Sequence, residues 1–93
     1  MNRKYIVSIL REAILENADI AVKIFGNIKI PEQIDDTILA LSSIDYVDLL
    51  IDVEKRLGFE IVEEIMVSSK ISINELAERI EKYAQYNAHF QDK

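Results

Sequence analysis

The 93 residues suffice for one domain, 1–93, with a single core, and 49% hydrophobic against 30% charged residues exclude a disordered chain. Two glycines and one proline are too few for a turn-rich all-β fold, and no apolar run reaches the roughly 18 residues of a membrane span. The whole chain has a net charge of −6, and its segment 32–67 contains ten acidic and only two basic residues. This acidic charge disfavours binding to nucleic acid. The absence of cysteine fits a reducing cytoplasm. We expect a cytoplasmic helical protein that does not insert into a membrane, and we expect it to be a monomer.

A first helix is predicted over about 3–17. Its apolar residues recur at helical spacing and should form one side of the core: Tyr5, Ile6, Ile9, Leu10, Ala13 and Ile14. Asn17 is a suitable last residue.

The segment 18–41 is predicted to be a long ordered loop, because Gly26-Asn27 and Pro31 interrupt it and it lacks a sustained helical period. The β-branched runs on either side of Gly26-Asn27 would also suit a hairpin, but an isolated hairpin in a helical chain is only marginally stable. We expect the apolar side chains of the loop to insert into the core: Ile24, Phe25, Ile28, Ile34, Ile38 and Leu39.

A second helix is predicted over about 43–57. Ser42 is a suitable N-cap with Asp45 three residues later, and Gly58 supplies the left-handed residue that commonly ends a helix. At 100° per residue, one apolar stripe lies on a face about 100° wide: Tyr46, Leu49, Leu50, Val53 and Leu57.

A second, narrower stripe lies roughly 130° away on the same helix. It consists of Ile44, Val47 and Ile51, and four carboxylates border it: Asp45, Asp48, Asp52 and Glu54. Two interpretations remain open at this point. The helix is either buried on two sides, as at the centre of a bundle, or it buries one stripe and exposes the other to a partner.

Two more helices are expected after Gly58. A short helix is predicted over about 62–67, followed by a polar break. Ser72 and Glu75 form a capping box for a final helix over about 73–86, and a frayed polar tail, 87–93, should follow.

The run Ser43-Ile44-Asp45-Tyr46-Val47-Asp48-Leu49-Leu50, continuing through Glu54 to Gly58-Phe59-Glu60-Ile61, resembles the carrier-helix signature of acyl carrier proteins. That signature is approximately D-S-L-x-x-V-E-L, followed by an acidic helix and F-G-I-x-I. The match covers about twenty residues without a gap, and it is looser over the rest of the chain. Ser42 replaces the usual aspartate and Ala40 the usual glycine, which puts in question which transferase and partners recognise the chain.

The resemblance implies an all-α fold, namely a four-helix acyl-carrier-like bundle with a long loop between helices 1 and 2 and a short third helix. It also implies that Ser43 carries a covalent 4′-phosphopantetheine arm donated by coenzyme A, with Ser42 as the alternative acceptor. The arm would hold a fatty acyl, polyketide or aminoacyl cargo as a thioester.

The implied partners are a phosphopantetheinyl transferase, an acyl- or aminoacyl-loading ligase, and synthase or transferase enzymes with basic patches. The residues expected to bind them are Ile44, Asp45, Val47, Asp48, Ile51, Asp52 and Glu54. We expect no catalytic residue, no metal site and no enzyme activity. The alternative function is an unmodified acidic adaptor of the same fold that binds proteins through Ile44, Val47 and Ile51.

Overall fold

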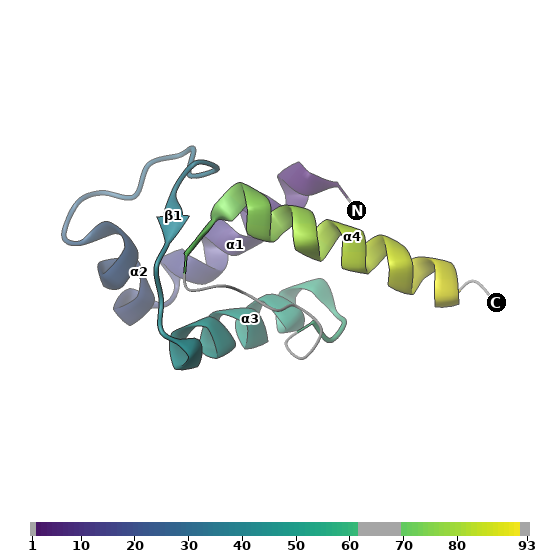
Figure 1. Cartoon of the computed structure of the whole chain (residues 1–93). Coiled ribbons are helices and arrows are strands. Elements are labelled where there is room, and N and C mark those ends of the chain that lie inside the picture. Colours follow the sequence, from purple (N-terminus) through teal and green to yellow (C-terminus); the bar gives the residue numbers. More distant parts are fainter. Residues whose placement is uncertain (1, 62–69, 92–93) are drawn as a thin grey trace.

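The structure, a computed structural model, describes residues 2–61 and 70–91, with side chains up to Gln85. Its elements are the helices α1 (Arg3–Leu15), α2 (Ala18–Phe25), α3 (Ser43–Leu57) and α4 (Ile73–Gln91) and the short strands β1 (Ile38–Leu39) and β2 (Ile71–Ser72) (Figure 1). The chain is therefore mostly helical, as its composition predicts. The predicted short helix 62–67 lies outside the described residues.

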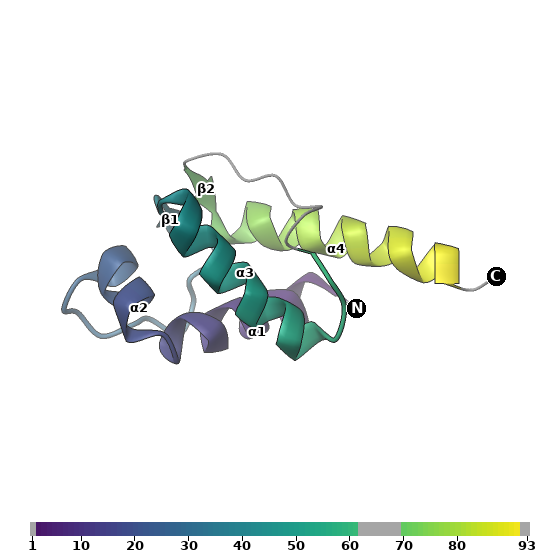
Figure 2. The same cartoon turned by 90° about the horizontal axis from the view of Figure 1, so that it is seen from below.

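Helix α1 is the element against which the others pack, since it contacts α2, α3 and α4. It runs in the opposite direction to α3 and α4 in both views (Figures 1 and 2). The buried face of α1 comprises Ile6, Ile9, Leu10, Ala13 and Ile14, whereas Tyr5, which the sequence also placed in the core, is 47% exposed. The core thus lies between α1 on one side and α3 and α4 on the other.

The predicted loop 18–41 is wrong at its beginning, because residues 18–25 form helix α2. The side chain of Asn17 accepts a hydrogen bond from the Ile20 amide at 3.2 Å and so caps α2, which also explains why α1 ends at Leu15 rather than at residue 17. Ile20 is buried, and Ile24 and Phe25 pack against the core. This tertiary packing offsets the low helix propensity of the β-branched residues.

Gly26 ends α2 with φ of 68° and ψ of −140°, a backbone conformation that residues with a Cβ rarely adopt. In the loop that follows, Ile34 and Leu39 are buried as predicted. Ile28 and Ile38 are instead 67% and 56% exposed, so their predicted insertion into the core is wrong. Alternation explains Ile38, since adjacent residues of β1 point to opposite faces and Leu39 takes the inner one.

A two-stranded sheet, which was not predicted from the sequence, joins the loop to the start of α4. Strand β1 pairs antiparallel with β2, with Leu39 opposite Ile71. The carbonyls of Asp35 and Thr37 accept hydrogen bonds from the Asn74 and Ile73 amides, both at 2.9 Å. The loop is thereby fixed to the start of α4 just before it enters α3.

Helix α4 begins as predicted, because the Ser72 hydroxyl accepts a hydrogen bond from the Glu75 amide at 3.0 Å. The helix continues to Gln91, so its predicted end near residue 86 is wrong. Residues 87–91, which were predicted to be a frayed tail, are helical instead. Neither glycine nor proline lies between these positions to stop the hydrogen-bond ladder. Among the described helices, none combines the length and apolarity required to cross a membrane.

Candidate functional site

Ser43 is the first residue of α3, and it is exposed. Ser42 precedes it in extended conformation as the N-cap, as predicted, and its hydroxyl accepts a hydrogen bond from the Asp45 amide at 3.2 Å. The Ser42 carbonyl accepts the next one, from the Tyr46 amide at 3.0 Å. The amides of Ser43 and Ile44 come before these bonds and point out of the helix N-terminus.

Residues 40–42, which we call the entry loop, are fixed in position by a hydrogen bond from Tyr46 to the residue before the loop. The Tyr46 hydroxyl donates a buried hydrogen bond of 2.8 Å to the carbonyl of Leu39, and only 6% of Tyr46 is exposed. Burial raises the pKa of the Tyr46 phenol, so the neutral donor is favoured in the folded protein. The entry loop is thus tied to β1 at one end and to the first turn of α3 at the other.

We expect Tyr46→Phe to lower the free energy of unfolding by about 1–2 kcal/mol, because the buried Leu39 carbonyl loses a donor. Urea denaturation near pH 7 measures this loss. Tyr5→Phe on the exposed face of α1 is the matched control and should change stability by less than about 0.5 kcal/mol. Because the folded-state pKa of Tyr46 is raised, the difference between wild type and Tyr46→Phe should shrink only above about pH 10.

The second stripe of α3 is exposed, which decides between the two interpretations of this helix. Ile44, Val47 and Ile51, here called the apolar strip, are 75%, 42% and 38% exposed. The first stripe faces the core as predicted, with Tyr46, Leu49, Leu50 and Val53 buried and Leu57 partly buried. A single helix therefore contributes to the core and also presents an apolar surface to solvent.

The four carboxylates beside the apolar strip differ in their contacts. Asp45 pairs with Lys23 of α2, with 2.8 Å between Nζ and Oδ2. Asp52 pairs with Arg56 at 3.2 Å, and a Glu54 oxygen accepts a hydrogen bond from the Ile61 amide at 2.7 Å. Asp48 is exposed, and no described side chain or amide binds its carboxylate. The four carboxylates predicted to border the strip are therefore unequally available to a partner.

Lys23 is a residue of this site that the sequence pattern did not predict. Helix α2 places it beside Asp45, and the missed signal was Asn17 as an N-cap directly before Ala18. The hydrogen bond from Lys23 lowers the pKa of the Asp45 carboxyl, and the Asp45 partner raises the pKa of Lys23. Asp19 and Asp48 add electrostatic attraction to Lys23, which places the ammonium group among three carboxylates.

Replacing Lys23 by glutamine should raise the pKa of Asp45 towards its usual value, 3.8, because its hydrogen-bonded cation is removed. An NMR titration that follows the Asp45 side-chain carboxyl carbon measures the change. Lys4→Gln, an exposed lysine of α1, should leave the Asp45 pKa unchanged. In the wild type, the contribution of the pair to stability should be present at neutral pH and be lost as the pH falls through the lowered pKa of Asp45.

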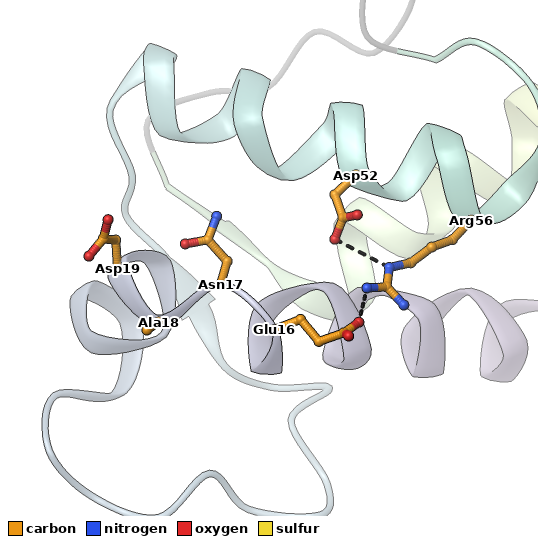
Figure 3. A pocket seen from close by; sticks show the side chains of 6 residues that line it. All are labelled: Glu16, Asn17, Ala18, Asp19, Asp52 and Arg56. Carbon is orange, nitrogen blue, oxygen red and sulfur yellow. Dashed lines mark hydrogen bonds and ion pairs between the residues drawn. The ribbon is translucent and has the colours of Figure 1, made fainter.

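Arg56 joins α3 to α1 at an open cleft of about 470 Å³ lined by Glu16, Asn17, Ala18, Asp19, Asp52 and Arg56. Figure 3 shows the guanidinium group between the carboxylates of Glu16 and Asp52, with which it pairs. Glu12 lies 3.5 Å from a third guanidinium nitrogen. The pairing with Glu16 and then Asp52 raises the pKa of Arg56. Since Arg56 binds carboxylates of both helices, its ion pairs with Glu16 and Asp52 join α1 to α3 at this cleft.

No group of three or more potential metal ligands occurs among the described residues. Comparisons with protein-family models, with curated proteins and with solved structures found no match for this chain. At the start of α3, an exposed serine lies beside an exposed apolar strip and an exposed carboxylate.

Proposed function

We propose that this protein is a carrier that bears an acyl or aminoacyl group on a 4′-phosphopantetheine arm attached to Ser43. The observation that carries the proposal is the exposed Ser43 at the first position of α3, within the run that resembles the acyl carrier signature. The arm, once attached, would supply a thiol that holds the cargo as a thioester. The chain itself would supply a fixed position and a recognition surface.

The local geometry suits a phosphodiester on Ser43. An exposed hydroxyl is accessible to a second protein, and the first amides and the positive end of the helix dipole favour a negative group. The entry loop is fixed by Tyr46 and β1, so the backbone that precedes Ser43 is held in place before any partner binds. Under this proposal the transferase supplies the base that deprotonates Ser43 and the metal ion for the transfer. The Ser43 oxygen forms the new phosphodiester bond as the pyrophosphate bond of coenzyme A breaks, and adenosine 3′,5′-bisphosphate leaves.

The surface beside Ser43 suits transient encounters with basic partners. The apolar strip offers a small area to bury, and Asp48 can attract lysine or arginine without first breaking a hydrogen bond or ion pair with a described residue. The proposal includes an acyl-carrier-like four-helix bundle with a short third helix. The antiparallel arrangement of α1 relative to α3 and α4 supports this part of the proposal. The proposed partners are the transferase, a loading ligase and the enzymes that use the cargo.

Incubation with coenzyme A and a broad-specificity phosphopantetheinyl transferase tests the proposal. We expect the intact mass to rise by one arm, and digestion should locate the added mass on the peptide that contains Ser43. Modification of Ser42 instead would retain the carrier function but move its site. A chain that gains no mass with any transferase would contradict the proposal.

The same apolar strip favours a second candidate function, an unmodified adaptor that binds proteins through Ile44, Val47 and Ile51. This function needs no arm, so a negative mass experiment would favour it. Its own test is the triple replacement of the strip by serine, which should abolish partner binding while the buried stripe of α3 preserves the fold.

A further inference from the structure

Helix α2 brings a cation to the acidic side of α3. The inner face of α2 contains Ile20, which is buried, whereas Asp19, Val22 and Lys23 lie on its exposed face. From there the Lys23 ammonium group reaches Asp45 Oδ2 at 2.8 Å. The Lys23 side chain remains 53% exposed, but the Asp45 side chain is only 15% exposed. Asp45 is therefore covered and neutralised from within the chain.

This pairing divides the carboxylates that a basic partner could use. Asp48 is exposed and can meet an incoming arginine or lysine at once. An incoming cation must compete with Lys23 for the Asp45 carboxylate, because the Lys23 ammonium group already binds its Oδ2 atom. An exposed ion pair of this kind is weak, so a partner with several cations can displace it.

Lys23 also has a second carboxylate within its own helix. Asp19 lies four residues before it on the exposed face of α2, a spacing at which opposite charges are neighbours on a helix. Asp19 already attracts the ammonium group in the present arrangement. A rotation of the Lys23 side chain from Asp45 to Asp19 would release Asp45 and leave the lysine paired.

We propose that Lys23 is a specificity-determining residue of the partner surface, an intramolecular competitor that occupies Asp45 until a basic protein displaces it towards Asp19. A partner with a single cation at this position binds Asp48 alone, and a partner with a cluster of cations also gains Asp45. The surface thereby discriminates between basic proteins by their number of charges. The inference uses the proposed function only to identify the partners as carrier enzymes; the competition itself requires no arm.

Hexa-arginine peptide is the probe for the competition, and binding is measured by NMR titration of the α3 amides at low ionic strength. Lys23→Gln should bind the peptide about three- to fivefold more tightly than Lys4→Gln, which makes the same charge change at an exposed position in the first turn of α1. The advantage should vanish in the presence of Asp45→Asn and should fall with added salt. Equal affinities of the two lysine variants would overturn the proposal.

Asp19→Asn supplies an effect of opposite sign. It removes the second carboxylate for Lys23, so displacement of Lys23 from Asp45 becomes less favourable. The peptide should therefore bind Asp19→Asn more weakly than it binds Glu60→Gln, a control variant at an exposed glutamate beyond the end of α3. Tighter binding to Asp19→Asn than to Glu60→Gln would contradict the exchange. Thermal unfolding of all variants shows whether the fold is retained, and Lys23→Arg, which keeps the pair, should behave as wild type.

A second measurement separates this inference from the proposed function. The rate at which the transferase modifies Lys23→Gln, relative to Lys4→Gln, should rise in parallel with the affinity for hexa-arginine. If no transferase modifies the wild type but the peptide still prefers Lys23→Gln, the carrier function fails and the competition stands. If the wild type is modified at Ser43 but both lysine variants bind the peptide equally, the carrier function stands and the competition fails.

Discussion

Replacement of Ser43 by alanine is expected to abolish attachment of the phosphopantetheine arm completely. The transfer would form a phosphodiester on the side-chain oxygen, and alanine has none to offer. Ser43 is exposed and outside the core, so the variant should fold as well as the wild type. Intact-mass measurement after incubation with the transferase and coenzyme A gives the result, and circular dichroism verifies that the helices persist.

Ser42→Ala is the matched control on the preceding residue. It should retain the modification, because the acceptor hydroxyl of Ser43 is untouched. It should also lower the free energy of unfolding by about 1 kcal/mol, since the Asp45 amide loses its N-cap acceptor. Ser43→Ala is thus expected to change the modification, whereas Ser42→Ala is expected to change the stability. An arm that persists in Ser43→Ala and disappears in Ser42→Ala would show that the acceptor is the cap residue.

Ile14→Ala is expected to cause the largest loss of stability, about 3 kcal/mol from the usual range for a buried isoleucine. Ile14 is fully buried on α1, the helix that contacts α2, α3 and α4, and its truncation leaves a cavity between them. A domain of this size has a total stability of roughly 5–15 kcal/mol, so the variant should lose a large part of it. Urea denaturation monitored by circular dichroism measures the midpoint and the slope.

Ile44→Ala makes the same chemical change in a helix where the side chain is 75% exposed. It should alter the free energy of unfolding by less than about 0.5 kcal/mol, because little apolar area returns to water. It should weaken binding to any partner of the apolar strip. A stability loss equal to that of Ile14→Ala would mean that the strip is part of the core.

Helix α3 could be predicted from the sequence almost to the residue. Its cap Ser42, its terminal Gly58 and its stripe of buried residues are all local signals, and each depends only on neighbours within one or two turns. The same locality allowed Ser43 to be placed at the helix start. The core face of α1 and the first turn of α4 were predictable for the same reason.

The parts that were mispredicted depend on contacts between distant residues. Helix α2 has β-branched residues that are weak helix formers alone, and the burial of Ile20 against the core makes the helix favourable. Strand β1 exists because β2, more than thirty positions later, supplies its hydrogen-bond partner. Neither partner can be identified from local periodicity.

At the candidate site, the hydroxyl that begins α3 and the apolar residues on its outer face follow from the local sequence, because a helix fixes the direction of each side chain by its position. Which carboxylates already have a partner depends on how the helices pack. Lys23 and Asp45 are 22 residues apart, and their pairing exists only because α2 folds against α1 and comes to lie beside α3. Charge counts give the sign of a surface, but the fold determines which of its charges a partner can reach.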